Sequence, residues 1–223
     1  MEEFNCQVVA EKRIGGFWVK RATWALFLAL LIVLSSCSVM RDRYIFPSIP
    51  EFSGTKKDGL VVFQALSEDF FVNNEVGVHH VGDRQQKLKT MRGEVAKALQ
   101  ALITLRLTEK KHAVRVTDKN LWDLSIGDLG RQADNMTIIG GHIRVFILQA
   151  STITARVKTE YEFVVEVDCY IGKVGEKKVV KRTVRYVKEM LNISHSEKTM
   201  NALLDSFLEE AALQVAENIE SYL

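Results

Sequence analysis

The sequence predicts an α+β fold: a two-layer sandwich with a mainly antiparallel sheet, a three-strand meander within it, and two long helices on one face. Three observations predict it. Apolar and charged residues alternate over residues 153–171, one helical stripe of apolar residues precedes this stretch, and a second ends the chain. Alternation with period two is typical of a strand with one wet face, whereas recurrence every three or four residues is typical of a helix. Such helices can cover the dry face of the sheet as a second layer.

The first segment of the chain has the features of a secretory leader. An apolar run at residues 22–34 follows the basic pair Lys20 and Arg21 and ends in the motif LSSC at residues 34–37. A basic segment, a short hydrophobic core and small residues before a cleavage site are typical of a signal peptide. The run has 13 residues, whereas a membrane span needs about 20. We therefore expect residues 1–36 to be a signal peptide.

A branched apolar residue, two small residues and a cysteine resemble the lipobox of bacterial lipoproteins. The resemblance implies cleavage between Ser36 and Cys37, diacylglycerol on the Cys37 thiol, and a further acyl chain such as palmitate on the new amino terminus. Three fatty chains, each adding about 0.8 kcal/mol per buried methylene, exceed the threshold for stable anchoring. The mature chain is expected to be membrane-tethered and otherwise water-soluble. Because the segment before the apolar run is long and mixes both charges, we expect translation to begin internally, at Val19.

Charge and cysteine content restrict the class of function. Without residues 1–36 the chain keeps 26 basic and 25 acidic residues, and this balance favours no nucleic-acid partner. Of three cysteines, Cys6 lies in the leader and Cys37 would carry lipid, so no intramolecular disulfide can form. Cys169 falls on the apolar phase of a strand and is predicted to be an inert buried thiol, with a reactive or intermolecular role as the alternative.

The mature chain divides into a tether and one domain. Both prolines of the chain, Pro47 and Pro50, lie between residues 37 and 58. Proline removes a backbone donor and fixes its own φ, so residues 37–58 are expected to be the lipidated cysteine followed by a flexible tether. Residues 59–223 are expected to form the α+β domain, which would face the periplasm.

The first half of the domain combines short strands with a long helix. Asp83 and Gln86 have the spacing of a capping box, and the apolar stripe that follows ends near Lys110, which predicts a helix of about 27 residues. Asn73-Asn74 is predicted to be a turn. Strands are predicted at residues 59–64, 75–81 and 113–117, and a turn with one short helix at residues 120–135.

The second half is predicted to be the meander and the final helix. Strands at residues 138–149, 153–171 and 177–190 are separated by short turns. A strand of 19 residues would span roughly 60 Å at about 3.3 Å per residue, against a domain diameter of about 40 Å. It should therefore bend or bulge, and Val164, apolar on the wet phase, marks the expected place. Ser194 and Glu197 predict the cap of a last helix of about 27 residues.

The order of these elements over residues 59–222 resembles that of the YajG-like family of bacterial outer-membrane lipoproteins. Residues 138–149, residues 153–171 and the terminal helix carry the resemblance. It implies no established activity and no functional residue beyond Cys37. Ser38 is not the Asp that resembles an inner-membrane retention signal, so the resemblance implies the outer membrane.

Few residues suggest chemistry. His79 and His80 with Asp83 are the best metal candidates, but adjacent strand residues point to opposite faces, so partly exposed edge histidines and no metal are expected. His112, His142 and His195 are expected to make local hydrogen bonds. No nucleophile elbow, zinc-protease motif or phosphate loop occurs, so no cofactor is expected. Gly140-Gly141 is expected to serve close backbone packing. The carboxylates on the wet face of residues 153–171 are interpreted as solvated rather than as paired acid and base.

Three functions fit these patterns. The leading one is a non-enzymatic lipoprotein whose domain binds a partner in cell-envelope assembly or maintenance. The second is an accessory lipoprotein of a transport system that carries a lipid or other apolar ligand, and the third is an enzyme acting on peptidoglycan. A partner-binding domain should expose an apolar patch or strand edge, whereas a carrier needs an apolar cavity of about 300 Å³ or more. The sequence leaves the partner and the oligomeric state open.

Overall fold

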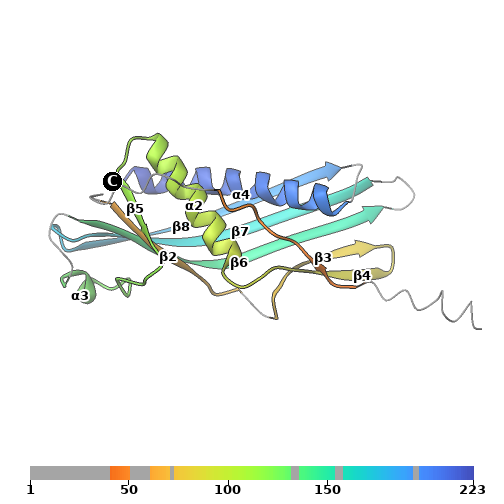
Figure 1. Ribbon diagram of the computed structural model, residues 1–223, viewed down its shortest axis with the longest axis horizontal. Helices are drawn as coiled ribbons and strands as arrows, with labels where there is room; N and C mark the ends of the chain where they lie inside the picture. The colour runs from red at the N-terminus through yellow and green to blue at the C-terminus, as the bar shows by residue number, and fades with distance from the viewer. Residues whose placement is uncertain (1–40, 51–60, 71–72, 132–135, 154–157, 193–195) are drawn as a thin grey trace, which may run out of the picture. The chain divides into compact units, whose positions relative to one another are not determined.

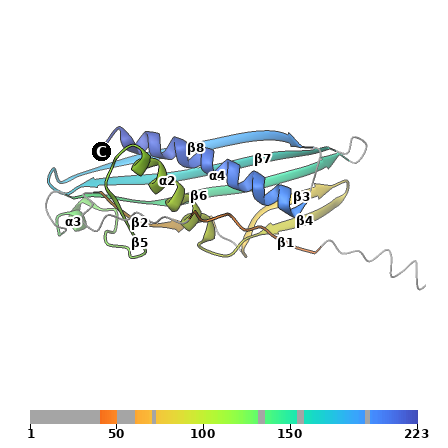
Figure 2. The same cartoon turned by 45° about the horizontal axis from the view of Figure 1, so that its top comes forward.

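The computed structural model describes residues 41–50, 61–70, 73–131, 136–153, 158–192 and 196–223. In these residues a mixed sheet of eight strands carries helices α2 and α4 on one face (Figures 1 and 2), which confirms the α+β class. The elements are β1 Arg43–Tyr44, β2 Val61–Glu68, β3 Glu75–Val81, β4 Arg84–Lys89, α2 Glu94–Glu109, β5 Val114–Thr117, α3 Ile126–Leu129, β6 Thr137–Ile153, β7 Lys158–Lys173, β8 Lys178–Asn192 and α4 Glu197–Glu220.

Strand β6 is the centre of the sheet. Along one side it pairs antiparallel with β7, which pairs antiparallel with β8. Along its other side it pairs parallel with two strands in succession, first β2 and then β3. Strand β5 adds to β2 in parallel, and the β3–β4 hairpin ends with β1 parallel to β4. The prediction of a mainly antiparallel sheet is therefore wrong in this half, where long connections allow parallel pairing.

The long alternating stretch at residues 153–171 belongs to two strands. Ile153 ends β6 and pairs with Lys158, the first residue of β7. The division shortens the strand to 16 residues, which at about 3.3 Å per residue is still longer than the expected diameter of about 40 Å. Val164 is regular, and the register shift lies in β6 between Ile143 and Val145. The predicted apolar phase of β7 is buried throughout: Tyr161, Phe163, Val165, Val167, Cys169 and Ile171.

The helix predicted from Asp83 begins later. Asp83 and Gly82, whose φ is 56°, form the turn of the β3–β4 hairpin. The Gln86 side chain donates a hydrogen bond to the carbonyl of Arg41 at 2.6 Å and caps nothing. Helix α2 begins at Glu94 and has 16 residues. The first turn of the predicted helix is a strand because pairing with β3 buries Leu88, which is 0% exposed.

A carboxylate from the sheet caps helix α2. Glu68, the last residue of β2, accepts hydrogen bonds from the backbone N–H of Gly93 at 2.6 Å and of Ala96 at 2.9 Å. Gly93 itself has a φ of 87° and no capping side chain. Glu68 therefore satisfies N–H groups that the helix cannot pair internally, and its charge suits the helix dipole.

Residues 41–50, expected to belong to the flexible tether, pack on the domain. Ile45 is 0% exposed and its N–H bonds to Lys89 O at 2.8 Å. The N–H and the hydroxyl of Ser48 each donate to Asp205 of α4 at 2.7 Å. Backbone pairing and burial thus hold this segment, and the remainder of the predicted tether lies outside the described residues.

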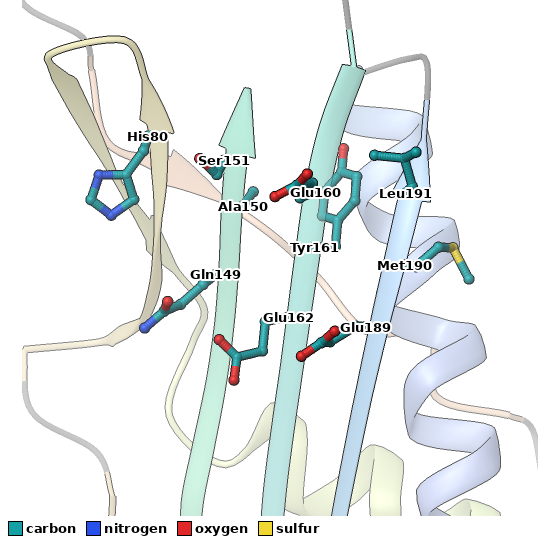
Figure 3. A pocket seen from close by; sticks show the side chains of 10 residues that line it. All are labelled: His80, Gln149, Ala150, Ser151, Glu160, Tyr161, Glu162, Glu189, Met190 and Leu191. Carbon is teal, nitrogen blue, oxygen red and sulfur yellow. The ribbon is translucent and has the colours of Figure 1, made fainter. Parts of the chain in front are cut away.

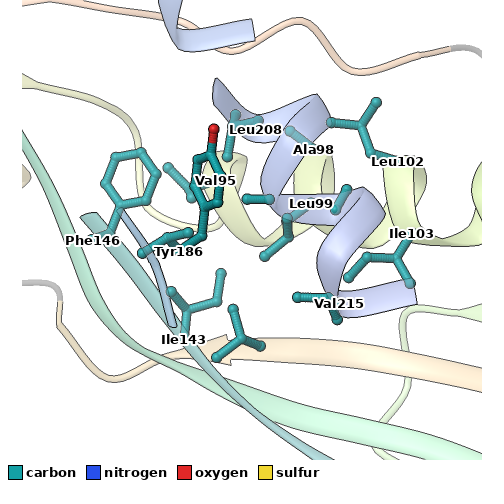
Figure 4. Packing of buried hydrophobic residues seen from close by; sticks show 14 of the residues in the cluster. Val95, Ala98, Leu99, Leu102, Ile103, Ile143, Phe146, Tyr186, Leu208 and Val215 are labelled. Carbon is teal, nitrogen blue, oxygen red and sulfur yellow. The ribbon is translucent and has the colours of Figure 1, made fainter. Parts of the chain in front are cut away.

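Helix α4 spans 24 residues and begins after Ser196, whose hydroxyl accepts from Thr199 N at 3.1 Å. The predicted cap, Ser194, lies outside the described residues. Figure 4 shows side chains of α2, α4 and the sheet meeting in one core. Aromatic rings pack against one another in this core. The ring of Phe163 in β7 lies 5.0 Å from that of Phe207 in α4 and 5.3 Å from that of Phe146 in β6, measured between centroids.

A second, smaller core lies on the opposite face of the sheet at one end. It contains Trp122, Leu129 of α3, Ile138 and Val174. Gln64 of β2 fixes the backbone of Trp122, since its side-chain amide donates to Trp122 O at 2.9 Å and accepts from Trp122 N at 3.1 Å. The short helix predicted in residues 120–135 is thus present as α3. Among the described helices, none has the length and apolar character needed to cross a membrane.

Candidate binding surface

Beyond the region of α3, no described element lies on the sheet face opposite α2 and α4 (Figures 1 and 2). We call this surface the open face. It is formed by alternate residues of three long strands, and these residues are Ile147, Gln149, Glu160, Glu162, Val164, Glu166, Asp168, Arg185, Val187 and Glu189. Strand β8 pairs only with β7 in the described sheet, so its other edge is also open.

An apolar row crosses the open face. Ile147 of β6, Val164 of β7 and Val187 of β8 are direct cross-strand neighbours. Ile147 is 38% and Val187 49% exposed, whereas Val164 between them is 7% exposed. Solvated sheet faces usually carry polar residues at such positions. A row of three apolar side chains is therefore a candidate contact for another molecule.

An acidic hollow adjoins the apolar row. It has a volume of about 480 Å³ and extends from His80 of β3 across β6 and β7 to Leu191 of β8. Figure 3 shows Glu160, Glu162 and Glu189 around it. Glu162 and Glu189 are direct cross-strand partners, and like charges so placed destabilise a sheet. Within the described residues none of the three carboxylates has an ion-pair partner.

On the other side of the row the charges are balanced. Asp168, 3% exposed, accepts from Thr183 at 2.5 Å and from Lys181 at 2.7 Å. Arg144, at the bulge of β6, lies 3.7 Å from Asp168 and 3.7 Å from Glu166. Burial alone would raise the pKa of the Asp168 carboxyl, but the hydrogen bonds from Lys181 and Thr183 outweigh it and hold the pKa below its ordinary value. This network is satisfied internally, in contrast to the acidic hollow.

Ser67, His142 and Asp69 meet beside a second hollow of about 330 Å³ next to α3. Ser67 Oγ lies 2.5 Å from His142 Nδ1 and 3.1 Å from Asp69 Oδ1. The Asp69 carboxylate also approaches Nδ1, at 3.6 Å. A catalytic triad needs the serine and the carboxylate on opposite ring nitrogens. Here both lie at the same nitrogen, so the arrangement is not that of a triad.

The histidine pair is divided between the two faces of the sheet, as predicted. His80 lines the acidic hollow. His79 points into the core, and its Nε2 lies 2.8 Å from Thr152 Oγ1. It is only 2% exposed, which corrects the expectation of a partly exposed side chain, and burial lowers its pKa. No group of three potential metal-binding side chains occurs in the part of the chain that the structure describes.

The remaining residues singled out in the sequence have separate outcomes. Cys169 is 0% exposed, as predicted, and burial raises the pKa of its thiol to about 12. Gly141 serves close packing, since a Cβ there would lie 2.2 Å from Asp168 O. Ser36, Cys37 and His195 lie outside the described residues, so lipidation and cleavage stay predictions.

The sequence does not predict which side chains are neighbours on the open face. It marks Val164 as an apolar residue on the wet phase, but its neighbours Ile147 and Val187 follow only from the strand register. Glu189 could have been found from its phase within residues 177–190. The absence of ion-pair partners for the three glutamates among the described residues could be seen only in the structure.

No family model and no curated protein matches this sequence. Among solved structures, a protein from Xanthomonas campestris is 8% identical over 78% of this chain and 92% of its own, with a TM-score of 0.46. Rare lipoprotein B from Shewanella oneidensis is 14% identical over 72% and 95%, with a TM-score of 0.37. A minor lipoprotein from Acinetobacter baumannii is 10% identical over 73% and 93%, with a TM-score of 0.36. At these TM-scores the likenesses carry no argument about function, and the resemblance to the YajG-like family stays a prediction.

Proposed function

We propose that this chain is a membrane-anchored bacterial lipoprotein whose non-enzymatic periplasmic domain binds a protein partner of the cell envelope through the open face. The observation that carries the proposal is the row Ile147–Val164–Val187 beside three glutamates without ion-pair partners among the described residues. Apolar contact would provide affinity, and the carboxylates would select a partner with basic groups. The motif at residues 34–37 supports the anchor, and Ser38, in place of the Asp that resembles an inner-membrane retention signal, supports the outer membrane.

The described residues support binding over carriage of an apolar ligand. The layer between the sheet and the helices is filled by stacked rings such as Phe163 and Phe207. The hollow of about 480 Å³ is open to solvent and lined by carboxylates, which disfavours an apolar ligand. The Ser67–His142–Asp69 geometry gives no support to hydrolytic chemistry.

The anchor is tested by metabolic labelling with palmitate. Wild-type protein should carry the label and be found in the membrane fraction, and Cys37→Ala should not be labelled. Equal labelling of both proteins, or of neither, would remove the anchor from the proposal.

The binding surface is tested by photo-crosslinking in living cells. A photoreactive amino acid at Val187 should form an adduct with an envelope protein, and the same group at Leu213, 39% exposed on α4, should not. The partner, identified by mass spectrometry and purified, should bind Val187→Asp at least about ten-fold more weakly than wild type, a loss of about 1.4 kcal/mol. Leu213→Asp should bind as wild type does. Equal effects of the two substitutions would refute the open face as the site.

A further inference from the structure

An apolar surface lies close in sequence to Cys37, the residue of the proposed anchor. Along residues 41–50 side chains alternate between the core and solvent: Ile45 is 0% exposed, whereas Tyr44 is 45% and Phe46 44% exposed. The two exposed rings stack on each other, with centroids 6.3 Å apart and planes inclined by 18°. Two large aromatic side chains are therefore held outward by a segment that is itself bound to the domain.

A third exposed apolar side chain follows strand β4. This strand runs parallel to β1 with Tyr44 beside Lys89, and Met91 comes two residues after Lys89, as Phe46 comes two residues after Tyr44. Met91 is 55% exposed. We call Tyr44, Phe46 and Met91 the β1 apolar surface.

Two arginines lie close in sequence to the residues of the β1 apolar surface. Arg41 precedes β1 and Arg92 follows Met91, and both are exposed. Neither guanidinium has a carboxylate within ion-pair distance among the described residues, whereas Lys89 between them is paired with Asp42 at 2.5 Å. Each arginine near an anionic lipid surface adds about 1 kcal/mol of attraction.

The number of residues between Cys37 and the β1 apolar surface limits how far that surface can lie from Cys37. Extended chain covers at most about 3.6 Å per residue, so Arg41 is within about 14 Å of Cys37 and Tyr44 within about 25 Å. A free tether up to residue 58 would have allowed any face of the domain to approach the membrane. The pairing of β1 with β4 and the bonds from Ser48 to Asp205 shorten the tether to residues 38–40.

We propose that the β1 apolar surface docks on the phospholipid surface that holds the anchor, so that the domain lies against the membrane in a fixed orientation. The proposal rests on lipidation of Cys37 in the proposed function. Tyrosine and other amphipathic rings are enriched where a membrane meets water, and exposed apolar side chains there leave water for the headgroup boundary. The chemistry recognised is that of a bilayer with anionic headgroups.

Fluorescence of the lipidated, signal-cleaved protein on vesicles tests the docking. Cleavage after Ser36 would remove Trp18 and Trp24, leaving Trp122, which is 2% exposed. Phe46→Trp adds one probe at the surface, and Ile126→Trp adds a matched probe on α3, where Ile126 is 61% exposed. The vesicles contain phosphatidylethanolamine, a minor share of phosphatidylglycerol, and brominated acyl chains that quench tryptophan at close range.

We expect the bromine-dependent quenching of the Phe46→Trp protein to be at least about two-fold stronger than that of the Ile126→Trp protein, with a blue-shifted emission, since only the first probe would enter the headgroup boundary. Equal quenching of the two probes would overturn the docking. Palmitate labelling of the same preparations separates the two proposals: absence of label refutes the anchor, whereas label with equal quenching refutes the docking alone. A photoreactive group at position 46 should join to phospholipid, and an adduct with protein instead would also overturn it.

Discussion

Substitution of Glu68 tests whether the sheet and helix α2 are coupled through a cap. Glu68→Ala removes the acceptor of two backbone N–H groups, at 2.6 Å from Gly93 and 2.9 Å from Ala96. Hydrogen bonds to a charged group contribute about 1.5–3 kcal/mol and helix caps about 0.5–2 kcal/mol. Since Glu68 is half-buried and water can replace part of the loss, we expect the free energy of unfolding to fall by about 2 kcal/mol. For a domain of this size the melting temperature should fall by about 4–8 °C.

Equilibrium unfolding in urea, followed by far-ultraviolet circular dichroism, measures this loss. Glu68→Gln keeps one carbonyl acceptor without the charge, so it should lose about half as much as Glu68→Ala. Glu176→Ala is the control, because the pair that Glu176 makes with Lys173 at 3.4 Å is exposed, and the substitution should change stability by less than about 0.5 kcal/mol. If Glu68→Ala falls within the range of the control, the capping argument is wrong.

Three further predictions concern the sheet. Gly141→Ala places a Cβ 2.2 Å from Asp168 O, so the strands must separate and thermal melting should show a loss of about 3 kcal/mol or more; Gly127→Ala, whose nearest atom is 3.9 Å away, should melt as wild type does. Because the pKa of Asp168 is lower in the folded protein, its stabilisation is present above the unfolded pKa of about 3.9 and is lost as pH falls through the folded pKa. Denaturation across acidic pH should therefore show a larger drop in wild type than in Asp168→Asn, which keeps the lowered pKa of Glu210, and parallel curves would contradict the assignment. The buried Cys169 thiol, with its pKa raised to about 12, should resist iodoacetamide at pH 8 until urea unfolds the protein, and peptide mass spectrometry of modified Cys169 under native conditions would contradict this.

Local alternation predicted much of the sheet. Residues 75–81 were predicted as a strand and are β3, and the apolar phase from Tyr161 to Ile171 is the buried phase of β7. Period-two patterns predict the buried face of a strand because that face is set by the strand's own sequence. They do not predict which strands pair, because nothing in the local sequence distinguishes β2, which joins β6 in parallel, from a hairpin strand.

The cap of α2 shows why the helix start was misplaced. Asp83 and Gln86 satisfy the spacing of a capping box, but the same residues also suit a hairpin turn and a strand. The actual capping group, Glu68, lies 25 residues before Gly93. A capping residue so distant in sequence leaves no local signal.

The candidate site was predictable only in part. The wet-phase carboxylates Glu160 and Glu162 were identified from alternation, and both lie on the open face. The register between strands determines that Glu189 lies beside them and that Val164 aligns with Ile147 and Val187. The tether was overestimated because proline composition does not reveal that Ile45 can reach the core.

The arrangement of β2 and β3 end to end along one edge of β6 has a consequence for assembly. β6, β7 and β8 follow one another closely in the sequence and can pair early, whereas joining Val61 to Thr137 closes a long loop and is slow. Until the β3–β4 hairpin is in place, the later part of β6 presents unsatisfied peptide groups. Exchange of that hairpin between two molecules is accordingly the misassembly to expect when the protein refolds at high concentration.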